Sequence, residues 1–400
     1  MENDCKITLN TGLRGITIAN TRICEVDGKN GRLIYRGYMI QDLARASYEE
    51  VVHLLLHEYL PLAEELQPFR ARLAAERAIP PAVIAALRTF PAKALPMDVL
   101  QAAVPMLATH DPDIAELSRE ISREAALRMA HRLVAKFPTV IAAYHRIRSG
   151  TDPVAPAPDL GHAANFLFML NGRMPEDTAV RAIDTALVLH AEHAFNASTF
   201  AAREVASTQA HMYAAVAAGV GSLSGALHGG ANAKVMQMLL TLGSADKVAD
   251  FVNAELDAGR KIFGLGHAVY DVDDPRAHII APMSKALGDI VGEPRWYEMS
   301  KQIEHTAKDI FRKRKNADIP VNVDFYSASL YYYLGIPVDL FTPVFAIARI
   351  AGWAAHVIEE QFAGAAPKPV LYRPESEYVG DYCGPEECEF IPLENRKKSG

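Results

Sequence analysis

Cysteine is scarce in this chain, with four residues among 400, at positions 5, 24, 383 and 388. So few thiols exclude the disulfide framework of a small secreted protein. The one close pair, Cys383 and Cys388, has neither a second pair nor a nearby histidine to complete a tetrahedral zinc site. His53 and His57 share a helix face but lack the glutamate of a zincin motif, so we interpret them as ordinary helix histidines. We expect reduced thiols and no bound metal.

Basic charge is not in excess either, because 41 Lys and Arg residues stand against 48 Asp and Glu residues, a net charge of −7. A general nucleic-acid-binding protein would show the opposite balance, so we expect no nucleic-acid partner. An anionic ligand would have to be held by a few well-placed arginines or lysines. The basic run 312–315 is most simply a solvated helix end, with a phosphate contact as the alternative.

Long hydrophobic runs suited to a membrane or a signal are missing as well. The N-terminus has no apolar segment of the kind that a secretory signal contains. A long uncharged stretch, residues 210–227, carries glycines, serines and a histidine, which favours a buried helix over a membrane span. These features predict a soluble, cytoplasmic protein with no membrane partner.

What is present is the composition of a large globular protein. Apolar residues make up 50% of the 400 residues and charged residues 22%, which suits two or three domains with a substantial core. Residues 7–38 combine alternating apolar positions with Asp-Gly and Asn-Gly turns, which predicts short strands. After Ile40 the apolar spacing is helical almost throughout, to about residue 363. We therefore expect an all-α fold with a small β element at the N-terminus.

Arg349 lies inside an apolar helical segment, residues 340–358. The surrounding apolar side chains cover most of the helix, so we expect the guanidinium to be buried, and a buried charge needs a partner. Acidic residues are distant in sequence, since Asp339 is ten residues before it and Glu359 ten after it. The partner is either a carboxylate from elsewhere in the fold, in a structural ion pair, or an anionic ligand.

Two histidines accompany glycines that would let the backbone approach a ligand closely. His228 is followed by Gly229, Gly230 and a predicted helix, whose N-terminal dipole would keep the imidazole neutral. A neutral imidazole N–H can polarise a carbonyl group, and the alternative is a loop histidine that bonds the backbone. His267 follows the segment 264–266, which has glycine at both ends.

Asp324 begins a predicted helix and has two alternative roles. As a helix N-cap it would have a lowered pKa. Its apolar neighbours Val323, Phe325 and Tyr326 would instead raise the pKa toward the range of a general base. The two roles shift the pKa in opposite directions, and the sequence leaves both open.

Three further residues have an ordinary interpretation beside a functional one. Arg276 belongs to an Asp-Pro-Arg turn and is either a surface residue or a ligand contact. His190 and His193 share a helix face with apolar residues, so on that pattern alone both are interpreted as core histidines.

Eight segments together resemble the citrate synthase family, and the resemblance runs from about Gly12 to about residue 395. They occur in the family's order. They are 33–38 (LIYRGY), 96–100 (PMDVL), 228–232 (HGGAN), 264–267 (GLGH), 274–276 (DPR), 322–327 (NVDFYS), 352–356 (GWAAH) and 372–374 (YRP).

The resemblance implies a two-domain helical fold of the citrate synthase type. A large domain would consist of residues 1–228 and 334–400, the latter ending in a C-terminal arm. A small domain, residues 229–333, would be inserted in it and close over the substrates. The resemblance also implies a homodimer with shared active sites, in which Arg373 reaches into the partner's site.

By the same resemblance the chain is a citrate synthase, which condenses acetyl-CoA with oxaloacetate and water to give citrate and CoA. Acyl-CoA is a substrate, and no cofactor or metal is needed. Asp324 would remove a proton from the acyl methyl group, His228 would donate to the thioester oxygen, and His267 would polarise the oxaloacetate ketone. The implied oxaloacetate contacts are His193, Arg276, Arg349 and Arg373. The implied contacts to the CoA adenine are Ile262, Gly264, Leu265 and Gly266.

The chain departs from the family pattern at several positions. Ala268 and Asp271 stand where basic residues often contact CoA phosphates, so Lys261 or the run 312–315 would have to substitute. The Glu-His at 192–193 and the Ser-Ala-Ser at 327–329 also occur in relatives that use propionyl-CoA. A 2-methylcitrate synthase is therefore the nearest alternative. A non-catalytic acyl-CoA-binding paralogue is a further alternative, against which the intact catalytic histidines and aspartate argue.

Overall fold

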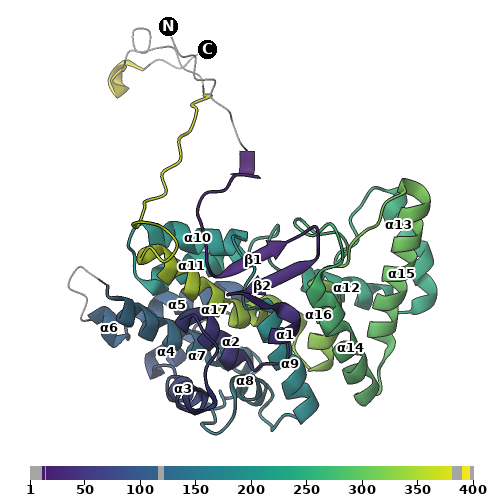
Figure 1. Ribbon diagram of the computed structural model, residues 1–400, viewed down its shortest axis with the longest axis horizontal. Helices are drawn as coiled ribbons and strands as arrows, with labels where there is room; N and C mark the ends of the chain where they lie inside the picture. The colour runs from purple at the N-terminus through teal and green to yellow at the C-terminus, as the bar shows by residue number, and fades with distance from the viewer. Residues whose placement is uncertain (1–10, 14, 116–120, 381–389, 397–400) are drawn as a thin grey trace.

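The computed structural model describes residues 11–13, 15–115, 121–380 and 390–396 (Figure 1). Helices make up most of it, and a small sheet near the N-terminus lies against them. The predicted all-α fold with a small β element is therefore confirmed. Cys383 and Cys388 lie outside the described residues, so the prediction for these thiols stays a prediction.

The sheet has three antiparallel strands in the order β1 (Cys24–Asp27), β2 (Arg32–Tyr35) and β3 (Tyr38–Met39). The turn between β1 and β2 ends at Gly31, whose φ of +61° favours glycine. Leu33 and Tyr35 are buried, as the alternation along a strand requires. The Tyr35 hydroxyl donates to the Glu192 carbonyl oxygen at 2.9 Å, which fixes the sheet to the segment after residue 190.

The helices before residue 224 form the larger part of the molecule. They are α1 (Ile40–Leu43), α2 (Tyr48–His57), α3 (Ala63–Ala75), α4 (Pro81–Leu87), α5 (Pro96–Ala108), α6 (Pro112–Ala115), α7 (Arg123–Arg148), α8 (His162–Asn171), α9 (Asp177–His190), α10 (Ala197–Ser207) and α11 (Met212–Leu223). Five helices follow, namely α12 (Ala231–Leu242), α13 (Val248–Asp257), α14 (Pro275–Ile290), α15 (Arg295–Lys315) and α16 (Val323–Tyr333), and then α17 (Phe341–Gln361). Short 3₁₀ turns are η1 (Thr11–Leu13), η2 (Ala245–Lys247), η3 (Val338–Leu340) and η4 (Leu393–Asn395).

Local sequence signals account for many helix starts. Ser47 and Glu50 form a capping box at the start of α2. Pro81, Pro96 and Pro275 each occupy the first position of a helix, where the missing N–H of proline has no intrahelical acceptor to lose.

Helix α17 is the centre of the core. Its residues from 346 to 361 are all buried, and it packs against α2, α7, α9, α10 and α11. The segment Val338–Gln361 is the one described helix long and apolar enough to cross a membrane, and 89% of its most apolar 18-residue window is buried inside the protein. Such burial is what a central core helix shows. The stretch 210–227 contains α11, and its buried residues confirm the predicted buried helix.

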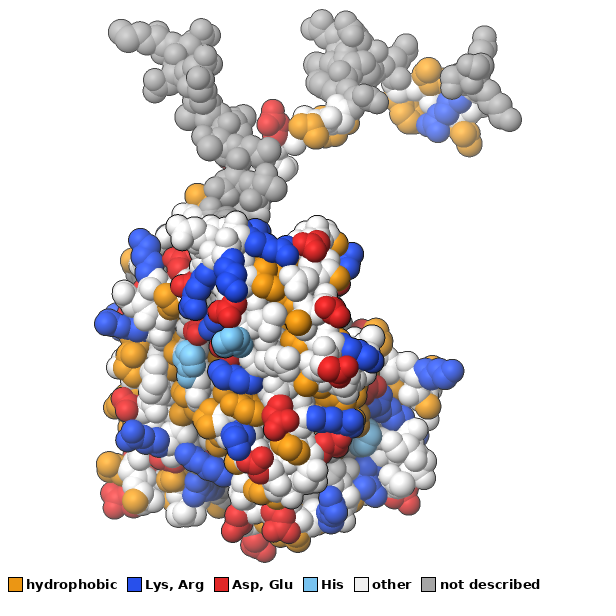
Figure 2. All heavy atoms as spheres, turned by 90° about the vertical axis from the view of Figure 1, so that its right-hand side faces the viewer, with side chains coloured by type: hydrophobic (Ala, Val, Ile, Leu, Met, Phe, Trp, Pro, Cys, Tyr) orange, Lys and Arg blue, Asp and Glu red, His pale blue; other side chains and the backbone are white. Residues whose placement is uncertain are grey.

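Helices α12 to α16 stand together at one side of the molecule (Figure 1). Within this group α14 and α12 pack against α16, and α13 packs against α15. The group meets the rest of the chain where α14 contacts α9 and where α12 contacts α17. Basic and acidic side chains are interspersed on the face that Figure 2 presents.

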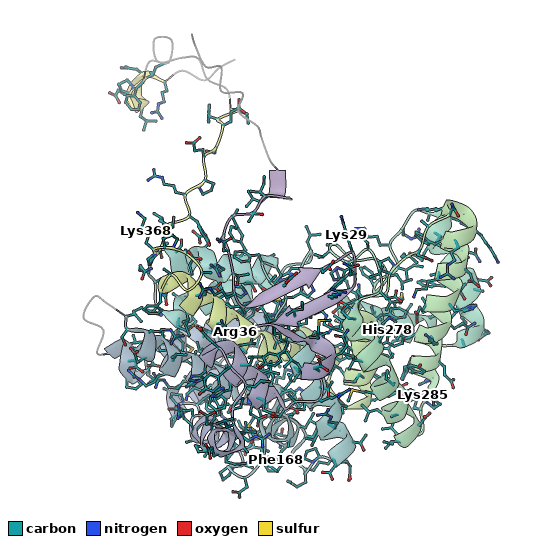
Figure 3. All side chains as sticks on the ribbon, in the orientation of Figure 1. Lys29, Arg36, Phe168, His278, Lys285 and Lys368 are labelled. Carbon is teal, nitrogen blue, oxygen red and sulfur yellow. The ribbon has the colours of Figure 1, made fainter. Side chains whose placement is uncertain are left out.

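After α17 the chain leaves the helical body as an extended segment. Lys368 marks its beginning in Figure 3, and the segment then runs away from the body. Residues 366–371 and 373–380 are exposed, whereas Tyr372 between them is half-buried.

Candidate active site

A solvent-open cavity of about 360 Å³ lies where the group α12–α16 meets α17. Residues that are far apart in the sequence come together in its wall. Seven predicted site residues line it, namely His193, His228, Gly266, His267, Arg276, Asp324 and Arg349. Among the described lining residues Arg373 is absent, because it lies exposed on the extended C-terminal segment.

His228 lies between α11 and α12 and is held in one neutral form. Its Nε2 accepts the backbone N–H of Ser198 at 3.1 Å and lies 2.8 Å from the Ser198 hydroxyl. Because a backbone N–H can only donate, Nε2 is the acceptor and the ring proton is on Nδ1. Burial, and secondly the charge of Arg349, lowers the pKa of His228 to about 4. The ring is therefore a neutral donor, with burial as the first cause of its lowered pKa, and the predicted contribution of the helix dipole stays a prediction.

His267 is held in the opposite tautomer. Its Nδ1 accepts the backbone N–H groups of Val269 at 2.9 Å and Tyr270 at 3.0 Å, so the proton is on Nε2. That Nε2 lies 3.9 Å from Asp274. Burial, reinforced by Arg276, lowers the pKa of His267 to about 4. The cavity thus presents two neutral imidazole donors.

Asp324 lies at the second position of α16, and Asn322 takes the N-cap position without a side-chain capping bond. Burial raises the pKa of the Asp324 carboxyl to about 6, against the opposing effects of Arg276, Arg349 and the backbone N–H of Asn232. Of the two roles left open, the structure therefore favours the raised pKa of a buried base over the lowered pKa of an N-cap.

Arg276 is buried, so the alternative of a surface residue was wrong. Its Nε and Nη2 donate to the two carboxylate oxygens of Asp274 at 2.9 and 2.7 Å. Asp274 is itself the N-cap of α14 and accepts the Arg276 backbone N–H at 3.0 Å. The Asp-Pro-Arg turn therefore folds the arginine back into the core, with its charge already balanced.

Arg349 is 1% exposed, as its apolar setting predicted. Its Nε donates to the His190 carbonyl oxygen at 2.9 Å, and its guanidinium lies 4.6 Å from the Phe345 ring centroid. Within the described part of the chain no carboxylate oxygen lies within 4.0 Å of it. The structural ion pair is thus not formed there, and the cavity keeps a cation suited to an anionic ligand.

His190 and His193 separate at the end of α9. His190 is fully buried, and its Nδ1 donates to the Ala186 carbonyl oxygen at 2.7 Å, as a core histidine would. His193 instead lines the cavity, with Nε2 3.3 Å from the Tyr270 hydroxyl. Burial lowers the pKa of His193 well below its usual value, and Arg276 adds to the effect.

Several polar residues of this site were not predicted from the sequence. Asn232 and Asn322 line the cavity, and the Asn232 Nδ2 and Asn322 Oδ1 atoms are buried without a hydrogen-bond partner. Ser198 holds His228 and accepts the Trp353 indole N–H at 3.1 Å. Both asparagines belong to motifs that we had quoted, but an asparagine beside a histidine or aspartate carries no separate signal in one sequence.

Of the residues expected to meet adenine, only Gly266 reaches the main cavity. Lys261 and Phe263 line a neighbouring cavity of about 400 Å³ together with Lys234 and Lys247. Both cavities share helix α12, whose first turn faces the main cavity and whose later turns face the neighbouring one.

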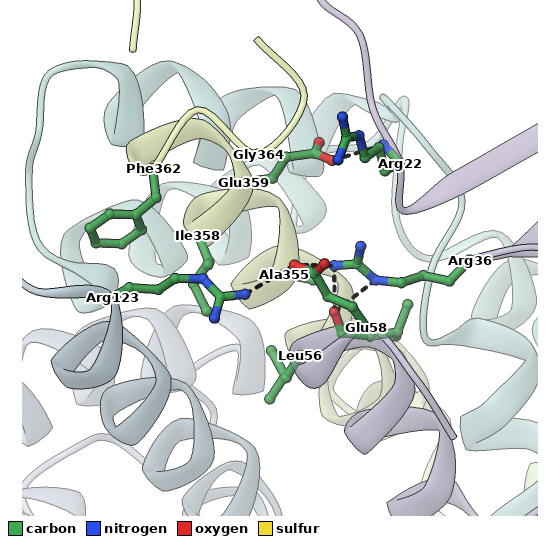
Figure 4. Close-up of a pocket in the computed structure, with 11 residues that line it drawn as sticks. Arg22, Arg36, Leu56, Glu58, Arg123, Ala355, Ile358, Glu359, Phe362 and Gly364 are labelled. Atoms are coloured by element: carbon green, nitrogen blue, oxygen red, sulfur yellow. Dashed lines mark hydrogen bonds and ion pairs between the residues drawn. The ribbon is translucent and has the colours of Figure 1, made fainter. Parts of the chain in front are cut away.

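The LIYRGY segment lies elsewhere, beside a small cavity of about 80 Å³ near the C-terminal end of α17 (Figure 4). There Arg36 donates to the Leu55 carbonyl oxygen at 2.9 Å, and Arg36 and Arg123 approach Glu58 at 3.8 and 3.0 Å. Glu359 accepts the Arg22 backbone N–H at 2.8 Å. These contacts hold the N-terminal segment on the core. Among the described residues no group of three or more His, Cys, Asp or Glu side chains could hold a metal ion.

The sequence of this chain is similar to those of known proteins. A family profile described as "Citrate synthase, C-terminal domain" matches residues 12–375. The chain is also 44% identical over 391 residues to the citrate synthase of Haloferax volcanii. The alignment covers 97% of this chain and 99% of that relative. The chain belongs to the citrate synthase family. Members of this family are transferases that condense acetyl-CoA with oxaloacetate.

Two further family members bear on the substrates. The chain is 38% identical over 370 residues to the 2-methylcitrate synthase of Mycobacterium tuberculosis. The alignment covers 92% of this chain and 90% of that relative. The structure of the present chain is similar to that of the citrate synthase of Thermoplasma acidophilum, which was solved as a ternary complex with carboxymethyl coenzyme A and oxaloacetate. The TM-score is 0.87 at 28% identity, over 97% of this chain and 100% of that chain.

Proposed function

We propose that this enzyme condenses acetyl-CoA with oxaloacetate and water to give citrate and CoA. The observation that carries the proposal is one cavity with a buried carboxylate of raised pKa, two neutral histidine donors and an arginine that has no carboxylate oxygen within 4.0 Å in the described part of the chain. This set of groups meets each need of the reaction, and no cofactor or metal enters the proposed steps.

Asp324 is the proposed base. The methyl group of an acyl-CoA thioester is weakly acidic, so its deprotonation needs a base at the carbon and a donor at the oxygen. With a pKa of about 6 the Asp324 carboxylate is a stronger base than an ordinary aspartate and remains mostly ionised at pH 7. The Nδ1–H of His228 donates to the thioester oxygen, where negative charge develops.

The nucleophilic carbon then attacks the ketone carbon of oxaloacetate, and a carbon–carbon bond forms as the carbonyl π bond breaks and its electron pair moves to the ketone oxygen. The Nε2–H of His267 donates to this oxygen, which takes up a proton equivalent to the one that Asp324 removed and becomes the hydroxyl group of the product. Water then hydrolyses the thioester, the carbon–sulfur bond breaks, and CoA leaves with the proton on its sulfur. Neutral imidazoles suit both donor steps. A positively charged imidazolium could instead protonate the Asp324 carboxylate, and it would be repelled by the nearby guanidinium groups of Arg276 and Arg349.

Oxaloacetate is a dianion, and the proposed contacts supply cations to match. Arg349 provides a positive charge with no carboxylate oxygen within 4.0 Å among the described residues, whereas Arg276 is paired with Asp274 and contributes directed N–H groups. His193 completes the set in the same subunit. We propose that Arg373 of a second subunit supplies the remaining contact in a homodimer, since its own subunit holds it on an exposed arm.

We propose that Ile262, Gly264, Leu265 and Gly266 meet the CoA adenine and that Lys261 supplies charge for the phosphates. The run 312–315 is less available, because Arg312 pairs with Asp318 at 2.6 Å and Arg314 is bonded to Asp257 at 2.5 Å. Lys261 is exposed beside the neighbouring cavity, where Lys234 and Lys247 add further positive charge.

The proposed small domain, residues 229–333, would close over the substrates. Its two boundaries carry glycines at positive φ, Gly230 at +83° and Gly335 at +74°. Such positions at the ends of helices can absorb the backbone rotation of a hinge. We also propose that the protein acts in the cytoplasm, in keeping with its scarcity of cysteine.

Propionyl-CoA is the alternative acyl donor, because a 2-methylcitrate synthase is among the relatives. One extra methylene in an apolar pocket changes the free energy of binding by only about 1–3 kcal/mol, so partial overlap is expected. The test is CoA release in the presence of oxaloacetate, with acetyl-CoA and propionyl-CoA compared by kcat/KM. A higher value for propionyl-CoA would support a 2-methylcitrate synthase, and no release with either would indicate a non-catalytic acyl-CoA-binding protein.

A further inference from the structure

A chain of buried polar contacts begins at Glu192, the neighbour of the cavity residue His193. Glu192 Oε1 lies 3.0 Å from Nε2 of His356, and His356 Nδ1 lies 2.9 Å from Nη1 of Arg203. Because a guanidinium only donates, Nδ1 of His356 is the acceptor and Nε2 carries the proton that is given to Glu192. The direction of both hydrogen bonds is therefore fixed.

Arg203 continues this chain toward the C-terminal segment. Its guanidinium pairs with Glu359 at 2.7 Å and with Glu360 at 2.5 Å, and all three side chains are buried. Glu360 also accepts the hydroxyl of Tyr372 at 2.6 Å. The Tyr372 backbone N–H donates to the Ser207 hydroxyl at 3.3 Å.

Tyr372 is thus the point at which the extended segment is fastened to its own subunit. Its ring also lies 6.0 Å from the Phe200 ring. Residues 366–371 before it and 373–380 after it are exposed. The fastening lies one residue before Arg373, so it sets where that arginine leaves the helical body.

We propose that Tyr372 is a positioning residue for Arg373, through its hydrogen bond to the Arg203–Glu360 pair. The inference rests on the proposed role of Arg373 at the neighbouring subunit's oxaloacetate. An exposed arm must lose conformational freedom when its arginine binds, and a fixed root leaves fewer residues to be ordered at that moment. Tyr372 itself is not among the described residues that line the cavity.

The test is Tyr372→Phe, which keeps the ring against Phe200 and removes only the hydroxyl. The KM for oxaloacetate should rise about tenfold, as loss of a hydrogen bond to a charged group predicts, while kcat and the KM for acetyl-CoA stay within about twofold. Tyr59→Phe is the matched control, because it removes a tyrosine–glutamate hydrogen bond of 2.9 Å to Glu65 away from the arm. It should change none of these constants.

A double-mutant cycle decides whether Tyr372 acts through Arg373. Arg373→Ala should raise the KM for oxaloacetate, and adding Tyr372→Phe to it should raise this KM no further. An equal rise in both backgrounds, or no rise with Tyr372→Phe alone, would overturn the positioning role and leave Arg373 in place. A normal KM in Arg373→Ala would overturn the proposed role of Arg373 and the positioning role together.

Discussion

The Asp324 carboxyl combines a raised pKa with burial, a combination that a surface aspartate does not have. Burial raises its pKa to about 6, while Arg276, Arg349 and the Asn232 backbone N–H limit the rise. The carboxylate therefore remains ionised at neutral pH with increased basicity. At the scale of single residues, this balance is the centre of the proposed chemistry.

Asp324→Asn should keep the fold and lose turnover by about a hundredfold or more, the usual contribution of a general base. The amide is similar in shape to the carboxylate but cannot accept the methyl proton. The measurement is steady-state CoA release by the purified variant, with its thermal unfolding midpoint as the control for folding. Turnover near that of the wild type in a folded variant would remove Asp324 from the mechanism.

At Gly352 there is no space for a larger side chain. A Cβ atom there would lie 2.1 Å from Glu192 Oε2 and 2.4 Å from the Ala191 carbonyl oxygen. Gly352→Ala should therefore lower the free energy of unfolding by about 1–3 kcal/mol, as overpacking of a core does. Denaturant unfolding measures this loss.

Gly161→Ala serves as the comparison for Gly352→Ala. Its φ of −62° suits alanine, and the nearest atom would lie 3.4 Å from the added Cβ. This variant should lose less than about 1 kcal/mol. Equal losses of unfolding free energy at the two positions would mean that the close approach of Glu192 to α17 does not determine how far Gly352→Ala destabilises the fold.

At the scale of elements, a histidine pair joins α2 to α7. His57 and His131 face each other with their Nε2 atoms 3.1 Å apart, so one donates and the other accepts. Burial lowers the pKa of His57 to about 4 and that of His131 to about 3. His53 and the nearby arginines at 72, 123 and 132 lower them further, and Glu65 opposes the shift at His57.

These lowered pKa values predict acid sensitivity of the fold. Below pH 6.5 the unfolded chain binds protons at these histidines and the folded chain does not, so stability falls as the pH falls toward 3. For the buried His131 the fall is up to about 1.4 kcal/mol per pH unit. His131→Gln should flatten the dependence of the unfolding free energy on pH between 4 and 6.5. An unchanged slope would assign the acid sensitivity to other groups.

At the scale of the whole molecule, the proposed dimer makes a prediction that a single subunit cannot satisfy. Asp324→Asn should be nearly inactive alone, and Arg373→Ala, whose KM for oxaloacetate is raised, should be nearly inactive when oxaloacetate is held near the wild-type KM. If Arg373 serves the partner's site, mixed subunits form heterodimers with one doubly altered site and one intact site. Random pairing makes half of the dimers heterodimers, so activity should recover to roughly a quarter of the wild-type value.

The control for this experiment is a tag pull-down that demonstrates subunit exchange. If Arg373 served its own subunit, every site would keep one altered residue. Mixing would then restore no activity even though exchange had occurred.

Sequence by itself predicted the fold class and most of the charged and histidine side chains that line the cavity. Helical periodicity after Ile40 and Asp-Gly and Asn-Gly turns before it are local signals, and local signals survive in a single sequence. The burial of Arg349 also followed from its own helix, because apolar neighbours cover that helix on most sides.

Tertiary structure decided what local pattern could not. Asp274 and Arg276 pair because the start of α14 folds back on itself within the core, which made a possible surface residue a buried one. The tautomers of His228 and His267 depend on backbone N–H groups of Ser198, Val269 and Tyr270, whose directions only the folded chain defines. The pKa of Asp324 was open in the sequence for the same reason, since burial and charge at a site are properties of everything that packs around it.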